Sequence, residues 1–407
     1  MNVATGGQAR GKAPRLARGS NQTTLRAYNE RLVLSLVRRF SNLAKADIAR
    51  STGLSPQTVS VIMRSLEKDG LLLRGTPTRG RVGQPSVPMS LNPKGAYSIG
   101  LKVGRRTADI ILIDFLGNIL LHLHKAFDFA QPQKILSFAK SGCQKIAKFL
   151  TPDEMQRVAG IGIAAPFEMW NWAYEVGAPQ AEMDAWRDFD LPGEIAKLVA
   201  YPVFLQNDAT SACGAELVFG VGHTYSDFLY FYIGSFVGGG VVVNSSLFSG
   251  KSGNAGALGS MLVPDQHGAA QQLISSASVI VLEKMLKTAG IDPRPLWHAT
   301  LEWVDFGPPL EEWIQASAKS LAHAIVSASA VIDFEAAIID GNFPAWVRKR
   351  IVAATQAAIL DVNTRGIVLP IVIEGRVGNQ ARAIGGASLP LFSRYLLDLN
   401  MLFKETP

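Results

Sequence analysis

The sequence predicts an α/β protein in which an N-terminal winged helix-turn-helix is followed by a larger, two-lobed body. Three observations lead to this prediction. Positive charge is concentrated in the first quarter of the chain, three helical patterns follow one another before residue 70, and strand patterns alternate with helices from Ala96 onward. With 407 residues, of which 48% are hydrophobic, the chain can bury more than one core.

Charge divides the chain into a basic head and a mildly acidic body. Residues 1–94 contain 16 Lys and Arg against 4 Asp and Glu, a net charge of +12, whereas the remainder contains 24 against 29, a net charge of −5. This asymmetry predicts a polyanionic partner for the head alone. Residues 1–20 are rich in Gly, Ala and Arg and lack a hydrophobic period, which is typical of a disordered arm.

Residues 21–92 have the pattern of a winged helix-turn-helix. Apolar residues at helical spacing predict a helix in TTLRAYNERLVLSLVRRF and a shorter one in AKADIARSTG. A third helix is predicted in LSPQTVSVIMRSLEKDG, where Ser55 is a suitable N-cap and Pro56 suits the first helical position. The following LLLRGTPTRGRVGQPSVPMSLN predicts two strands around a Gly/Arg tip, and this succession is typical of a DNA-binding head.

The third helix and the tip of the wing carry the candidate DNA contacts. Small polar side chains at the start of the helix suit base edges in the major groove, and the basic residues further along suit phosphates. The wing arginines suit a minor groove. The candidate DNA-binding residues are Ser55, Gln57, Thr58, Ser60, Arg64, Lys68, Arg79, Arg81 and Gln84. The alternative is a trihelical packing module with a solvated basic face, and the charge asymmetry favours DNA.

The body contains strand and helix patterns in a specific order. YSIGLKVGRRTADIILIDFLGNIL predicts a strand pair, and VAGIGIAAPF predicts a buried strand. PVFLQNDATSACGAELVFG predicts a strand followed by a helix that Asn207 and Asp208 open. DFLYFYIGSFVGGGVVVNSSLF predicts a glycine-rich hairpin, and GNQARAIGGASLPL ends the body. Strands punctuated by helices in this way predict two α/β lobes.

In their order and spacing these segments, over residues 25–395, resemble the ROK (repressor–ORF–kinase) family. The winged helix makes the chain similar to the xylose and N-acetylglucosamine repressors of that family. The resemblance implies an actin-like, sugar-kinase-like body, with residues 93–206 plus 380–407 in a first lobe and residues 207–379 in a second lobe that holds the ligand cleft and an oligomerisation surface. It also implies a homo-oligomer, a dimer or tetramer, on a double-stranded DNA operator.

Two loops depart from those of the active kinases in the family. A DxGGT-like loop binds phosphates and supports Mg²⁺ in the kinases, and the matching positions here, Lys102 to Thr107, read KVGRRT. Lysine in place of the carboxylate removes the support for magnesium. In the second loop, GSFVGGG, Phe236 occupies the place where the triphosphate would pass. Although Asp208 stands at the position of the kinase base, the resemblance therefore implies a ligand-binding pocket without enzyme activity, ATP or Mg²⁺.

The zinc motif of the family is missing as well. AGExGH and CxCGxxGCxE are replaced by AGALGS and HGAAQQLISSAS, so neither the structural zinc nor any other cofactor is expected. Ala257 and Ile274 stand where the family has two glutamates that bind sugar hydroxyls. His122 and His124 lie at strand spacing, and without a neighbouring carboxylate or thiol they predict a solvent-facing pair rather than a metal site.

A tryptophan-rich loop, FEMWNWAYEVGAPQAEMDAWRDFDLP, offers replacements for the missing sugar contacts. Trp170, Trp172 and Trp186 provide flat faces for a carbohydrate ring, and neighbouring polar groups suit its hydroxyls. The candidate ligand-binding residues are Glu168, Trp170, Asn171, Asn207, Asp208, Gly238 and Gly239. The alternative, in which the tryptophans pack the loop against a lobe or bury a dimer contact, stays open.

The sequence thus predicts a sequence-specific DNA-binding regulator of carbohydrate metabolism, a repressor, whose degenerate kinase-like body senses a sugar or related metabolite. A bifunctional sugar kinase and a regulator whose body binds a protein partner are the alternatives. Two cysteines outside any CxxC pattern predict a reducing compartment. With no apolar run of about 18 residues and no secretory leader, we expect a cytoplasmic protein without a membrane partner.

Overall fold

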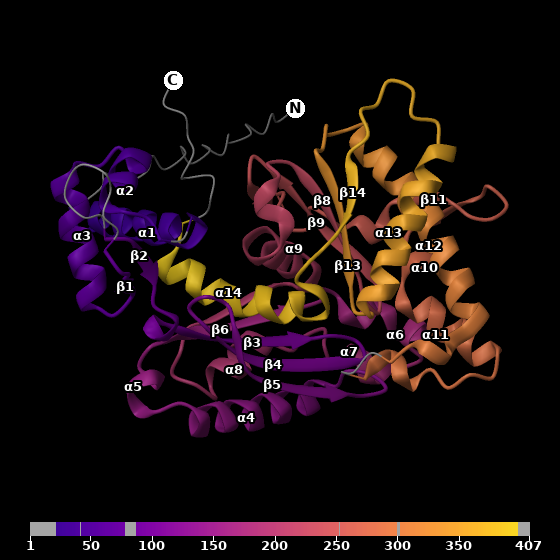
Figure 1. Ribbon diagram of the computed structural model, residues 1–407. Helices are drawn as coiled ribbons and strands as arrows, with labels where there is room; N and C mark the ends of the chain where they lie inside the picture. The colour runs from indigo at the N-terminus through magenta and orange to yellow at the C-terminus, as the bar shows by residue number, and fades with distance from the viewer. Residues whose placement is uncertain (1–21, 41, 78–86, 252, 299–301, 398–407) are drawn as a thin grey trace, which may run out of the picture.

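The computed structural model describes residues 22–40, 42–77, 87–251, 253–298 and 302–397. Figure 1 shows a small helical head beside a body with two sheets, and a long helix, α14, that reaches from the body to the head. Each of these two sheets has five strands, and the described residues form two further sheets of two strands each. The predicted fold class, a winged helix-turn-helix followed by a two-lobed α/β body, is confirmed.

The head has the predicted order of elements. They are α1 (Gln22–Phe40), α2 (Lys45–Thr52), α3 (Pro56–Lys68), β1 (Leu72–Arg74) and β2 (Met89–Leu91), the last two paired antiparallel. The backbone N–H of Thr58 donates to the side chain of Ser55, which caps α3 as predicted. The apolar face of α3 packs with α1 in one core, because its buried residues recur at helical spacing. The arm, residues 1–20, lies outside the described residues, as do Arg79, Arg81 and Gln84 of the wing.

The first sheet of the body has the strand order β5-β4-β3-β6-β7. Its strands are β3 (Tyr97–Val103), β4 (Thr107–Asp114), β5 (Ile119–Ala126), β6 (Val158–Ala165) and β7 (Val203–Asn207). β3, β4 and β5 pair antiparallel, whereas β6 joins β3 in parallel and β7 joins β6 in parallel. The apolar face of helix α4 (Pro132–Phe149) packs against this sheet.

The second sheet repeats this topology in the order β10-β9-β8-β13-β14. Its strands are β8 (Phe228–Ile233), β9 (Val237–Val243), β10 (Ser246–Phe248), β13 (Ala336–Gly341) and β14 (Ile371–Glu374). Again the first three strands are antiparallel and the last two are parallel. Helices α11 (Val279–Thr288), α12 (Gly307–Ser329) and α13 (Ala345–Ala358) share a core with its outer face. The body is therefore built from two sheets of the same design, a repeat that no sequence period indicates.

The remaining helices and strands of the described chain are shorter, and one of its 3-10 turns lies beside a cavity. They are α5 (Pro152–Met155), α6 (Ala173–Val176), α7 (Gln180–Asp184), α8 (Leu191–Ala196), α9 (Asp208–Phe219), α10 (Ile274–Ala277), β11 (Leu262–Pro264), β12 (Ala270–Gln272) and the 3-10 turn η2 (Met169–Trp172). Among the helices described, none is both long enough and apolar enough to cross a bilayer.

Helix α14 (Ala381–Tyr395) follows the second sheet in the chain but packs on β3 and β6 of the first. Glycines make this close approach possible. A Cβ atom at Gly162 of β6 would lie 1.8 Å from the carbonyl oxygen of Gly386, and one at Gly100 of β3 would lie 2.4 Å from that of Ala383. Because any side chain there would push the helix off the sheet, these glycines fix the position of α14.

Candidate functional site

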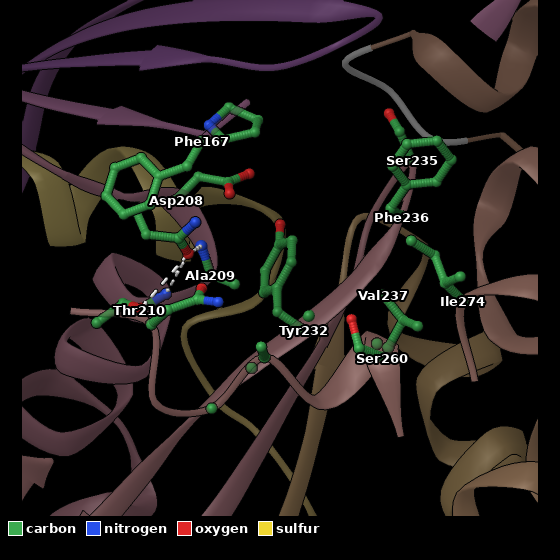
Figure 2. A pocket seen from close by; sticks show the side chains of 18 of the residues that line it. Phe167, Asp208, Ala209, Thr210, Tyr232, Ser235, Phe236, Val237, Ser260 and Ile274 are labelled. Atoms are coloured by element: carbon green, nitrogen blue, oxygen red, sulfur yellow. Dashed lines mark hydrogen bonds between the residues drawn. The ribbon is translucent and has the colours of Figure 1, made fainter. Parts of the chain in front are cut away.

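A cavity of about 470 Å³ lies between the two lobes, at the ends of β6 and β7 and beside the β8–β9 turn. Its lining includes Pro166, Phe167, Glu168, Trp172, Asn207, Asp208, Thr210, Tyr232, Phe236, Gly238, Gly239, Asn254, Ser260, Arg105 and Arg382. Figure 2 shows Asp208 and Phe236 on opposite sides of this cavity, with Tyr232 between them. Its volume falls in the range of small-molecule sites.

A buried ion pair forms one wall of the cavity. Asp208 is the first residue of α9, and its Oδ2 lies 3.1 Å from Nη1 of Arg382 on α14. The guanidinium also lies over the ring of Tyr232, 4.8 Å from its centroid. Burial opposes the charge of Arg382, but Tyr232 and Asp208 outweigh it and raise the pKa above its usual value. The carboxylate of Asp208 therefore lines the cavity while its cationic partner, Arg382, holds it in place.

The opposite wall is a stack of a guanidinium and two aromatic rings. Arg105, in the β3–β4 turn, lies over the ring of Phe236 at 4.3 Å and near that of Trp172 at 5.8 Å. The two rings are 4.9 Å apart. The pKa of Arg105 is lowered to about 10, mainly by burial; the charge of Asp208 opposes this shift and that of Arg382 adds to it. Since Phe236 belongs to the β8–β9 turn, the stack joins the two lobes across the cavity.

Behind the cavity, Asp109 connects a buried lysine to two histidines. Lys102 Nζ lies 3.2 Å from Asp109 Oδ2, while His122 Nε2 and His124 Nδ1 lie 2.9 and 2.7 Å from Oδ1. The other ring nitrogen of His124 meets the carbonyl oxygen of Trp297 at 3.1 Å. The prediction of a solvent-facing pair without a carboxylate partner is therefore wrong, because β4 places Asp109 beside both rings.

Asp109, His122 and His124 form the one cluster of possible metal ligands among the described residues, with ligand atoms within 4.8 Å of one another. We assign no metal to them, because Lys102 already neutralises the carboxylate from its other oxygen. Burial is the main cause that lowers the pKa of this lysine, to about 8.

The head rests on the far ends of α9 and α14. Arg31 of α1 donates to the carbonyl oxygen of Phe392 at 3.0 Å and to that of Leu396 at 2.8 Å. Ser35 of α1 accepts a hydrogen bond of 2.9 Å from the backbone N–H of Leu397. The guanidinium of Arg38 lies over the ring of Phe219, the last residue of α9, at 4.5 Å. Both helices thus begin with residues that line the cavity and end against the head; Figure 1 shows α14 reaching the head.

Comparison with known proteins agrees with this architecture. Residues 98–391 match the model of the ROK family, and residues 26–72 match a winged helix-turn-helix DNA-binding model. The chain belongs to the ROK family. The family resemblance deduced from the sequence motifs is therefore confirmed.

Several relatives of this ROK protein are repressors by name. It is 30% identical to the xylose repressor of Bacillus spizizenii over 246 residues, which are 60% of this chain and 62% of that protein. It is 23% identical to the transcriptional dual regulator NagC of Escherichia coli over 248 residues, 60% of this chain and 59% of NagC. The matched region thus spans less than two thirds of each relative.

Solved structures show the same fold. A ROK family transcriptional regulator described as a homologue of the E. coli Mlc protein superposes with a TM-score of 0.64 at 20% identity, over 91% of this chain and 97% of its own. A ROK glucokinase from Streptomyces griseus, in complex with glucose and AMPPNP, superposes with a TM-score of 0.57 at 19% identity, over 72% and 99%. At these identities the likeness shows the fold alone.

The ligand-binding residues predicted for this ROK protein divide into two groups. Five of them line the cavity: Glu168, Asn207, Asp208, Gly238 and Gly239. The side-chain oxygen of Asn207 caps α9 by accepting from two backbone N–H groups. Asn171 is absent from the lining and donates to Glu168 at 2.9 Å, so it holds Glu168 in place.

The tryptophans of the loop have different surroundings. Trp172 lines the cavity, whereas Trp170 lines a neighbouring hollow, where Arg187 lies over its ring at 5.5 Å. Trp186 is buried and donates to the carbonyl oxygen of Ala130. The structure thus brings one of the three rings to the cavity. Arg382 is not among the residues predicted from the sequence, and its only signal there is a lone cation in the small-residue segment ARAIGGAS.

The candidate DNA contacts on α3 lie on one open face. Gln57, Arg64 and Lys68 are exposed, whereas Thr58 and Ser60 are half-buried. The exposed Ser55 caps the helix through Thr58 and exchanges a hydrogen bond of 2.8 Å with its hydroxyl. Val61, which was not predicted, has an exposed fraction of 51% and follows Gln57 by one helical turn. An apolar side chain at that place suits the methyl group of thymine.

Proposed function

We propose that this ROK protein is a repressor: α3 reads operator DNA in the major groove, and the cavity between the lobes binds a sugar or related metabolite. The observation that carries the proposal is the pair of helices that joins the cavity to the head. α9 and α14 begin at the ion pair of Asp208 and Arg382, and they end against Arg38 and Arg31 of α1. The repressor relatives and the match to a winged helix-turn-helix model support it.

The ion pair gives a ligand a means to act on both helices at once. A sugar hydroxyl that donates to Asp208 binds the carboxylate that Arg382 holds through Oδ2, and so changes the strength of this ion pair. A shift at the start of α14 reaches the head through this helix together with the first sheet on which it packs; the helix is about 22 Å long at 1.5 Å per residue and contains Pro390. The ligand changes DNA affinity only by the difference in its affinity for the two arrangements.

An oligomer converts this shift into release. A dimer engages two half-sites about 34–36 Å apart only if its two recognition helices have the matching separation. A change in how α1 sits on α14 alters that separation, so we propose a dimer or tetramer as the DNA-binding form. A small reorientation then costs contacts in one of the half-sites.

We also propose that the body has lost phosphoryl transfer. In place of the kinase carboxylate, Lys102 is buried and paired with Asp109, so this position offers no magnesium ligand. The stack of Arg105, Phe236 and Trp172 stands where the phosphate loops of a kinase would meet the triphosphate. Asp208 then serves as a hydroxyl acceptor, and neither zinc nor nucleotide is required.

The test uses the full-length protein and duplexes that it selects from a randomised library. Binding is measured by fluorescence anisotropy with and without a panel of pentoses, hexoses and amino sugars, together with their acids and phosphates. We expect one ligand class to weaken DNA binding by about tenfold or more, which corresponds to a typical coupling free energy. Asp208→Asn is expected to lose the response, because it removes the carboxylate that the sugar hydroxyl binds.

Controls distinguish the alternatives. Glu168→Gln, a carboxylate at the mouth of the cavity outside the ion pair, reports whether the ligand occupies the cavity if Asp208→Asn is poorly folded. Failure to enrich any duplex at low ionic strength contradicts the repressor. Sugar-dependent ATP consumption supports the bifunctional kinase, and equal DNA affinity across the panel with a co-purifying protein supports a protein-sensing body.

A further inference from the structure

Four charged side chains line the cavity, two arginines and two carboxylates, and one cation and one anion among them form an ion pair. Arg382 is paired with Asp208, and the exposed Glu168 at the mouth is held by Asn171. Within the described residues, Arg105 makes no hydrogen bond and no ion pair, and its Nε is buried without a partner. One cationic side chain of the cavity therefore has no anion in direct contact within the part of the chain that the structure describes, and the charges of Asp208 and Glu175 attract it only from further away.

Leaving this guanidinium without a hydrogen-bonding partner raises the free energy of the folded state. A charged group that is largely removed from water without a hydrogen-bonding partner destabilises the folded state; Arg382 adds repulsion, and the attraction of Asp208 offsets part of this cost. In agreement with this cost, the pKa of Arg105 is lowered to about 10, mainly by burial. A ligand that supplies an anion recovers more of this cost than a neutral acceptor does, because hydrogen bonds between charged groups are stronger.

The geometry leaves the donors of Arg105 available. The rings of Phe236 and Trp172 contact the guanidinium, and such stacking contacts hold a guanidinium by the face of its plane. The N–H groups project from the edge of that plane, where a carboxylate or phosphate accepts two parallel hydrogen bonds. The N-terminus of α9, a helix of 12 residues, meets the same cavity and adds the positive end of its dipole.

We propose that the effector is an anionic carbohydrate, a sugar that carries a carboxylate or a phosphate, with its anionic group on Arg105 and its hydroxyls toward Asp208 and Asn207. The inference rests on the proposed function and names the class of its ligand. Carboxylate and phosphate share the chemistry that Arg105 recognises, so the experiment separates the two sources. The aromatic faces of Phe236 and Trp172 then line the passage between the anionic and hydroxyl subsites.

Two sets of probes test the proposal on the full-length protein by calorimetry at constant ionic strength. Inorganic phosphate and acetate probe the anion subsite without any assumption about the sugar. Glucose, glucuronate and glucose 6-phosphate, and the corresponding galactose series, probe the whole cavity. We expect an anionic member to bind about tenfold or more tightly than its neutral parent, as a bidentate charged hydrogen bond predicts.

Variants assign the effect to one side chain. Arg105→Gln is expected to abolish the preference for the anion, Arg105→Lys to keep part of it, and the exposed Arg365→Gln to leave it unchanged as a charge-matched control. Equal affinity for neutral and anionic forms, or an inorganic anion that binds Arg105→Gln as it binds the wild type, overturns the inference. A neutral sugar that releases DNA overturns it while the repressor stands. No release of DNA by any member, together with no anion binding, overturns both.

Discussion

The contact between Arg31 and the end of α14 gives a prediction whose size follows from the structure. Arg31 is half-buried and donates to the carbonyl oxygens of Phe392 and Leu396, which are near the C-terminal end of α14 and lack helical partners of their own. Hydrogen bonds from a charged donor contribute about 1.5–3 kcal/mol each. Because the arginine is partly solvated, we expect Arg31→Met to weaken the docking of the head by about 2 kcal/mol in all.

Hydrogen exchange measures this loss without a ligand or an operator. The amide of Leu397 donates to Ser35 of the head and is buried, so it exchanges only when the head leaves the body. A loss of about 2 kcal/mol corresponds to about thirtyfold faster exchange at this amide, since about 1.4 kcal/mol is tenfold. Amides in the centre of β3 are expected to keep their protection, because the body has its own core.

Arg26→Met is the matched control for Arg31→Met. Arg26 lies on the same helix but contacts only the head, through Glu30 and Ser65. We expect it to leave exchange at Leu397 unchanged. If Arg31→Met also left this exchange unchanged, or if both variants accelerated it equally, the idea that Arg31 fastens the head to α14 would be refuted.

Three further predictions concern other parts of the molecule. The hydrogen bond to Asp109 raises the pKa of His124. The stabilising contribution of this hydrogen bond is therefore fully present below about pH 6.5 and is lost as the pH rises through the raised pKa. In urea unfolding across this window, His124→Gln should remove this pH dependence of the free energy of unfolding. Gly162→Ala should lower the free energy of unfolding by about 3 kcal/mol, because its Cβ would overlap the carbonyl group of Gly386, and a change within 0.5 kcal/mol on denaturant titration would contradict the packing of α14. Lys68→Ala should weaken binding to all duplexes alike and reduce the slope of log affinity against log salt by about 1, whereas loss of discrimination between duplexes would place this residue at a base edge instead.

Local patterns in the sequence were sufficient for the elements of the head. Apolar spacing identified the buried face of α3, and Ser55 with Pro56 identified its first turn, because the cap and the helix that it begins are neighbours in the chain. The segments of the body were recognised by order and spacing. The duplication of the two sheets was not, since equal topology does not require similar residues.

The sequence by itself determined which faces are buried, where helices begin, that the head is basic and that the kinase loops are altered. Only the tertiary structure decided which side chains meet, because pairing depends on how the chain returns to the first sheet. Asp208 and Arg382 are 174 positions apart and touch only because glycines let α14 lie close against β3 and β6. The same return places the end of α14 under Arg31, and no local period encodes a contact between segments at opposite ends of the chain.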